Sequence, residues 1–307
     1  MTIHRFQPSI YHTAFGPYKP ALRIADGDTV ITTTVDNAGR DASDQKVTDG
    51  PNPLTGPFYI EDAEPGETIA VRLRRLWPNR PTGRSSTIIA PNVVDPDYMT
   101  EMPPSRPRIT AEWELDLKGG TATLVKPETK LGRLTLPLAP MLGCIGVAPP
   151  SGQAISSVTS STHGGNMDYK GFVTGTKVYL PVFSPGGLFF IGDGHAAQGD
   201  GEIVGTGIEV SFDVELTVRL HKDKKISWPR AENEEYVMTA GNARPLDQAF
   251  QHATTEMIRW LQEDFDLDAR ATHILLGQCA EYDVGNAFDP AYTMVCKLKK
   301  KLLARPE

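Results

Sequence analysis

Apolar residues occupy every second position from Ile208 to Leu220, and polar residues fill the positions between them. An alternation this long predicts a β-strand with one face on a core and one in water, which places Glu209 on the water side. Residues 69–73 and 113–117 alternate in the same way, and Lys118–Thr121 supplies a hairpin turn after the second segment. The first two-thirds of the chain are therefore predicted to be rich in strands.

The spacing of apolar residues changes in the last third of the chain. Positions from Leu246 to Leu261 recur with a helical period just after Pro245, and a second helix is expected over about 268–281. Alternation over 292–298 predicts a closing strand. Many short strands followed by two helices indicate a mainly β fold, a β-sandwich or barrel with an α+β C-terminal portion. We expect a β core over residues 1–225 and an α+β portion over 226–307 packed on it.

Charge and composition narrow the classes of function. The 307 residues include 31 Lys or Arg and 38 Asp or Glu, a net charge of −7. Nucleic acid is therefore not expected as a partner, because phosphate binding needs a basic face. The uncharged stretch 134–167 is interrupted by prolines and glycines, so no membrane span is expected. Three cysteines without CxxC spacing, and an N-terminus without an apolar signal segment, predict a reduced cytoplasmic protein.

Two polar clusters next to charge-free sequence carry the candidate chemistry. They are THGGNMD at 162–168 and GDGHAAQGDGE at 192–202. A third acid, Asp36, follows a strand predicted over 30–35 and can project into the same pocket. Buried charge is costly unless it is paired or bound to a metal. The candidate set mixes imidazole with carboxylate, which suits zinc, while more oxygen-rich sets suit manganese or calcium: Asp36, His163, Asp168, Asp193, His195 and Glu202.

Each candidate also has a plainer interpretation. Aspartates in glycine-rich strings often cap turns, a single histidine such as His163 is often structural, and no fixed ligand spacing such as HExxH is present. Cys144 needs a neighbouring base to act as a nucleophile, and its apolar surroundings favour a small buried side chain instead. The serines at 156–161 lack a GxSxG elbow, which disfavours a serine nucleophile.

Several long strings resemble the acetamidase/formamidase family across nearly the whole chain. They are VDNAGRD at 35–41, GPNPLTGPFYIEDAEPGETIAV at 50–71, MLGCIGVAPPSG at 141–152 and STHGGNMDYKGFVTGTKVYLPVFSPGGLFFIGDGHAAQGDGEIVGTGIEVS at 161–211. The family pattern after Asp36 continues with Gly-Gly-Gln, whereas this chain has Gly39-Arg40-Asp41. These two charged departures could alter the wall of the pocket and the choice of substrate.

The resemblance implies hydrolysis of short linear amides, such as formamide and acetamide, to a carboxylate and ammonia. It also implies a jelly-roll or CUB-like β-sandwich, a divalent metal ion and a homo-oligomer, a dimer or larger. A small-lactam hydrolase (γ-lactamase) using the same centre is an alternative. A β-sandwich module that binds a metal or ligand without catalysis is another.

We assign roles on this basis. Asp36, His163, Asp193 and His195 are expected to hold the metal, which would activate a water molecule and polarise the amide carbonyl. Glu202 is the expected general base and then acid. Asn166 and Asp168 are expected to orient the amide by hydrogen bonds.

Overall fold

The long alternation near residue 210 forms a central strand of the largest sheet. In the computed structural model, which describes residues 1–104 and 109–303, β17 (Phe212–His221) lies between β4 (Thr29–Thr34) and β6 (Thr68–Pro78). Val214, Leu216 and Val218 of β17 are buried in the main core, as the alternation predicts. Residues 208–211 precede β17 and are buried on both sides, so Glu209 does not face water.

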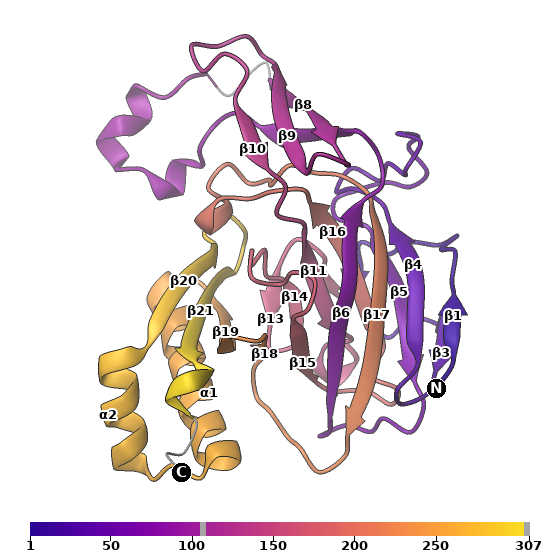
Figure 1. Cartoon of the computed structure of the whole chain (residues 1–307), viewed down its shortest axis with the longest axis vertical. Helices are drawn as coiled ribbons and strands as arrows, with labels where there is room; N and C mark the ends of the chain where they lie inside the picture. The colour runs from indigo at the N-terminus through magenta and orange to yellow at the C-terminus, as the bar shows by residue number, and fades with distance from the viewer. Residues whose placement is uncertain (105–108, 304–307) are drawn as a thin grey trace.

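This sheet has nine strands and runs through both parts of the chain (Figure 1). Its order is β1 (Ile3–Arg5), β4, β17, β6, β15 (Lys177–Pro181), β18 (Arg230–Glu232), β19 (Tyr236–Ala243), β21 (Tyr292–Lys299) and β20 (Glu281–Asn286). β15 pairs with β18, so the hydrogen-bonded sheet continues across the division expected at 225/226.

A six-stranded sheet faces the first. Its order is β13 (Ser160–Ser161), β14 (Gly164–Asn166), β11 (Met141–Val147), β16 (Phe189–His195), β5 (Leu54–Ile60) and β3 (Leu22–Ile24). Apolar side chains of both sheets, such as Val71 and Leu180 of the first and Ile145 and Ile191 of the second, form one buried cluster. Burying each such side chain contributes about 1.5–3 kcal/mol. The fold is therefore mainly β with two facing sheets, as predicted.

Smaller elements surround the two sheets. A four-stranded sheet, β7 (Thr82–Ser86), β8 (Thr110–Asp116), β9 (Thr121–Lys126) and β10 (Thr135–Pro137), extends from one end (Figure 1). The predicted hairpin turn joins β8 to β9. β2 (Ala14–Phe15) pairs with β12 (Ile155–Ser156). The 3₁₀ turns are η1 (Pro91–Val93), η2 (Pro96–Thr100), η3 (Pro150–Gly152), η4 (Asp200–Glu202) and η5 (Lys300–Leu302).

Two helices pack on the part of the nine-stranded sheet that β19 and β21 form. α1 (Leu246–Phe265) begins after Pro245. α2 (Ala269–Cys279) follows its N-cap residue Asp268, whose carboxylate accepts a hydrogen bond from the Ala271 amide at 2.8 Å. Met257 and Leu261 of α1 join a second core with strand residues such as Val237 and Leu298. Neither helix, nor any other among the described residues, is long and apolar enough to cross a membrane.

Gly241 of β19 allows α1 to approach the sheet closely. A Cβ atom there would lie 2.1 Å from the Ala249 carbonyl oxygen and 2.5 Å from the Ala253 amide nitrogen. Gly241→Ala is expected to destabilise the protein by about 1–3 kcal/mol, because backbone atoms of α1 would have to move. Urea unfolding measures this loss.

Gly277→Ala is the matched control. Gly277 is an exposed residue of α2, and a Cβ atom added there would have no neighbouring atom within 4 Å. Alanine should therefore stabilise the protein by up to about 1 kcal/mol through its higher helix propensity. Equal stability of the two variants would contradict the close approach at Gly241.

Candidate active site

The site is built where β11 and β16 pair in the six-stranded sheet. Leu142 pairs with Gly194 and Cys144 with Gly192, which places Gly143 opposite Asp193. A Cβ atom on Gly143 would lie 2.1 Å from Asp168 Oδ1 and 2.7 Å from Asp193 Oδ2. Glycine at this position therefore leaves a space into which the two carboxylates project.

His195, the last residue of β16, lies at the centre of the acids. Its Nε2 is 3.0 Å from Glu209 Oε1 and 3.5 Å from Asp193 Oδ1, and its Nδ1 is 2.8 Å from Gln198 Oε1. Gln198 Nε2 donates to the carbonyl oxygens of Asp168 and Gly285, which fixes the orientation of the Gln198 amide group. Gln198 Oε1 therefore accepts from His195 Nδ1–H, and Nε2 is the nitrogen that faces the carboxylates.

Two groups of potential metal ligands share this histidine. One consists of Asp193, His195 and Glu209, and the other of Asp168, His195 and Glu202, with the ligand atoms of each group within 4.8 Å of one another. All five side chains are buried. Asn286 Nδ2 links the second group, because it lies 2.6 Å from Asp168 Oδ2 and 3.1 Å from Glu202 Oε2.

Three buried atoms of these groups lack a hydrogen-bond partner within the described residues: Asp168 Oδ1, His195 Nε2 and Glu209 Oε2. The short distance from His195 Nε2 to Glu209 Oε1 is thus not a well-directed hydrogen bond. An unpartnered buried polar atom is costly, whereas ligands that converge on one cation approach each other in this manner. The donor set and the space beside Gly143 therefore fit a divalent metal ion.

Burial, and then the proximity of other acids, raises the pKa values of the carboxyl groups in the centre. Burial is the largest cause, and neighbouring carboxylates add to it: the pKa of Glu209 rises to about 7 and that of Asp289 to about 6. Burial and the charge of Asp193 likewise raise the pKa of Asp168 well above its usual value, and burial and the charge of Asp168 do the same for Glu202. For His195, burial disfavours the charged ring, but the carboxylates of Glu209 and Asp193 outweigh it and raise the pKa well above its usual range.

A cavity of about 610 Å³ opens onto this centre. Its wall includes Asp193, Glu202, Glu209 and Asp289 on the side of the centre, and Lys46 and Arg84 elsewhere. Arg84 is bound by Asp44 and Lys46 by Asp49. The cavity thus gives a small molecule access to buried carboxylates.

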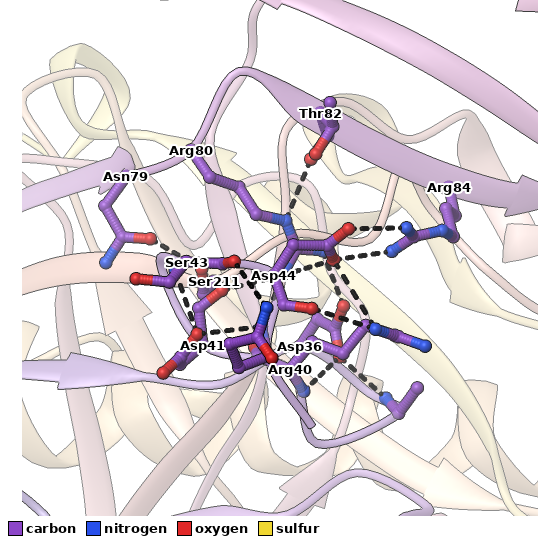
Figure 2. Close-up of polar contacts among 12 residues, drawn as sticks. Asp36, Arg40, Asp41, Ser43, Asp44, Asn79, Arg80, Thr82, Arg84 and Ser211 are labelled. Carbon is purple, nitrogen blue, oxygen red and sulfur yellow. Dashed lines mark hydrogen bonds and ion pairs between the residues drawn. The ribbon is translucent and has the colours of Figure 1, made fainter. Parts of the chain in front are cut away.

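Asp36 follows a buried strand as predicted, but it lies outside both ligand groups. Its Oδ2 is 2.5 Å from Arg80 Nη2, and its Oδ1 accepts from the amides of Ala38 and Arg40. Figure 2 shows Arg80 between Asp36 and Asp44, with Arg84 reaching Asp44. Both carboxylate oxygens of Asp36 therefore hold the loop after β4 in place.

Arg40 and Asp41, the two residues that differ from the family pattern, belong to this same loop. Their carbonyl oxygens accept hydrogen bonds from Arg80 Nη1 at 3.3 and 3.1 Å (Figure 2). The cavity wall contains their neighbours Asn37, Ala38 and Lys46 instead. Asn52 connects the loop to the centre. Its backbone N–H donates to the Asn37 carbonyl oxygen, and its side-chain Nδ2 donates to Asp193 Oδ2 at 3.1 Å.

His163 also lies outside the two groups. Its ring is fully buried against Phe15, with ring centroids 5.2 Å apart, and neither ring nitrogen has a partner among the described residues. Burial lowers the pKa of His163 to about 4, so the ring is neutral. Cys144 is fully buried and its Sγ contacts Asn166 Oδ1 at 2.9 Å, while burial and then Asp193 raise its pKa, which disfavours a thiolate nucleophile.

The structure thus brings together Asp168, Asp193, His195 and Glu202 of the predicted set, and places Asn166 in the adjoining cavity wall. Sequence reasoning missed Glu209, Asn286 and Asp289. Glu209 lies in an alternating segment that predicted a strand with Glu209 on its water-facing side. Asn286 is the last residue of β20 and Asp289 lies in the turn that follows it, where only the Asp289-Pro290 turn signal was visible.

The chain is thus a mainly β protein whose buried acids around one histidine could hold a metal ion. A sequence model of the acetamidase/formamidase family matches residues 151–280. The structure of an acetamidase from Yersinia enterocolitica is 36% identical, covers 99% of this chain and 93% of its own, and superimposes with a TM-score of 0.85. The chain therefore belongs to the acetamidase/formamidase family of amidohydrolases.

Two further proteins resemble the chain more weakly. A putative formamidase of Schizosaccharomyces pombe is 26% identical over 272 residues, 71% of this chain, and the match spans 65% of that relative's length. A γ-lactamase from Delftia acidovorans is 19% identical over 95% of this chain and 89% of its own, with a TM-score of 0.59, which shows a shared fold alone.

Arg80→Met tests the anchoring role of Asp36. Removing the guanidinium leaves Asp36 buried without its partner, which should cost about 3–5 kcal/mol in urea unfolding. Arg133→Met, which breaks an exposed pair with Glu114, should stay within about 1 kcal/mol of the wild type. A small effect of Arg80→Met would show that the loop is held in another way.

Glu209→Gln tests the raised pKa at the centre. In metal-free protein the wild-type carboxyl binds its proton more tightly when folded, with a pKa of about 7 against 4.5, so the wild type loses stability as pH rises through this window. The glutamine variant has no such loss, and its stability relative to the wild type should increase by about 3 kcal/mol between pH 4.5 and 8. Urea unfolding of chelator-treated protein at several pH values measures the difference, and a pH-independent difference would contradict it.

Proposed function

We propose that this protein hydrolyses the C–N bond of short linear amides, such as formamide and acetamide, to a carboxylate and ammonia with the help of a bound divalent metal ion. The observation that carries the proposal is the buried centre around His195, which has unpartnered potential ligand atoms and whose Asp193, Glu202 and Glu209 line a cavity. Family membership supports the amide as the substrate class.

His195, Asp193 and Glu209 are the proposed metal ligands, and Asp168 is a fourth. Asp168 suits the metal better than the substrate, because its carboxylate is fully buried and is not part of the cavity wall. Such a metal ion would supply an activated water molecule at neutral pH and polarise the amide carbonyl. One imidazole with carboxylates suits zinc, and the excess of oxygen donors keeps manganese and calcium as the alternatives that elemental analysis separates.

Glu202 is the proposed general base and acid. It lines the cavity beside the ligand groups, and burial with the charge of Asp168 raises its pKa well above its usual range. A carboxylate with a raised pKa can take a proton from water and return it to the departing nitrogen. Asn166, also in the cavity wall, is proposed to help orient the amide group.

Family membership favours this enzyme over a non-catalytic binding module. The γ-lactam alternative rests on a shared fold alone and has no support from the site itself. The homo-oligomer and the cytoplasmic location stay predictions from the sequence.

Ammonia release from formamide and acetamide tests the proposal directly. A chelator is expected to abolish release, and adding back the metal found by elemental analysis should restore it, because the metal supplies the reactive water. His195→Ala should lose both metal and activity. Full turnover by protein verified to be free of metal would refute the metal-dependent mechanism.

Glu202→Gln separates the base from the metal ligands. We expect kcat to fall by about 10²–10⁴-fold while the metal content stays unchanged. Glu61→Gln, which removes an exposed carboxylate paired with Arg23, should match the wild type in both measurements. Loss of metal in Glu202→Gln would instead identify Glu202 as a ligand.

A further inference from the structure

The end of β20 and the turn after it bring Asn286 and Asp289 of the C-terminal portion into the site. Asn286 is fully buried, and its Oδ1 accepts hydrogen bonds from the amides of Phe288 and Asp289 at 2.8 and 2.9 Å. Its Nδ2 lies 2.7 Å from Asp289 Oδ2, in addition to its contacts with Asp168 and Glu202. One side chain therefore fixes the shape of the turn and ties it to the acids of the centre.

Asp289 is hydrogen-bonded through one carboxylate oxygen and lines the cavity. Asn166 Nδ2 donates to Asp289 Oδ2 at 2.6 Å, so both amide groups, those of Asn166 and Asn286, reach the same oxygen. Asp289 belongs to neither group of potential metal ligands, yet it is part of the cavity wall. Its Oδ1 is thus the oxygen that a molecule in the cavity can meet.

The charges in the cavity indicate what this oxygen would accept. The ion pairs made by Asp193, Glu202, Glu209 and Asp289 within the described residues involve only His195, whereas Lys46 and Arg84 are occupied by Asp49 and Asp44. A carboxylate oxygen accepts hydrogen bonds and cannot bind a carbonyl oxygen. In a primary amide the nitrogen carries two N–H donors, and it gains a proton as it departs.

We propose that Asp289 is a substrate-binding residue that accepts an N–H from the amide nitrogen and thereby selects primary amides over compounds without N–H, such as esters. The inference rests on the proposed function. In the reaction, the water oxygen forms the new C–O bond, the C–N bond breaks, and the nitrogen leaves as ammonia with a proton that originates from that water. Asn166 and Asn286 are positioning residues that hold Oδ2 of Asp289, and Asn166 thereby helps to orient the amide group through Asp289.

Asp289→Asn tests this assignment with an isosteric change. The donors of Asn166 and Asn286 would hold the new amide oxygen at the Oδ2 position, which turns the new NH₂ group toward the substrate nitrogen. We expect kcat/KM for acetamide to fall by about 10- to 100-fold. The value for methyl acetate, which has the same acyl group but no N–H, should stay within about threefold; if the wild type does not cleave this ester, its competitive inhibition constant is compared instead.

Asp283→Asn is the matched control. Asp283 lies on β20, the strand that precedes the turn with Asp289, and its carboxylate is bound by Tyr169 and Lys297 outside the cavity wall, so its variant should retain the wild-type values for both compounds. An equal loss on acetamide and methyl acetate in Asp289→Asn, or no loss on either, would overturn the assignment of Asp289. Absence of amide turnover in the wild type would instead overturn the proposed function itself.

Discussion

The structure depends on the cost of burying several carboxylates around a single imidazole. Asp168, Asp193, Glu202 and Glu209 are all almost inaccessible to solvent, and the imidazole of His195 lies beside Asp193 and Glu209. Such a cluster is unstable unless protons, amide donors or a metal ion compensate its charge. The raised pKa values and the unpartnered ligand atoms are two signs of incomplete compensation within the protein.

The surrounding fold explains how the cluster can exist at all. Gly143 leaves the space that Asp168 and Asp193 occupy, and Asn286 brings amide hydrogens from the far end of the nine-stranded sheet. On the opposite side, Arg80 fixes the loop whose Asn52 reaches Asp193. Because β15 pairs with β18, the strands that carry Asn286 are part of the same sheet as the N-terminal strands. The C-terminal portion therefore completes the site as well as covering the sheet with helices.

Local periodicity predicted the strands around residues 69–73, 113–117 and 212–220 and both helices, because apolar spacing reflects which face of an element is buried. A different signal, polar residues among glycines next to apolar sequence, pointed to Asp168, Asp193, His195 and Glu202, because such a composition is typical of a buried polar site. The sequence could not separate Asp36 from the potential metal ligands, because the partner of Asp36, Arg80, lies 44 residues away in sequence. Glu209 was missed for a related reason. Alternation shows which face of a strand a residue lies on, but it does not show whether other parts of the chain bury that face.

The cost of burying several carboxylates links the stability of the fold to the proposed chemistry. A divalent ion at His195 would replace the protons that the metal-free centre binds at neutral pH, so the ion would stabilise the folded state while it prepares the carboxylates for catalysis. Asp289 differs from the other acids in this respect. It belongs to neither ligand group, and two neutral amides rather than a cation compensate its charge. An acid of this kind keeps its capacity to accept a hydrogen bond after the metal is bound, which is the property that recognition of an amide nitrogen requires.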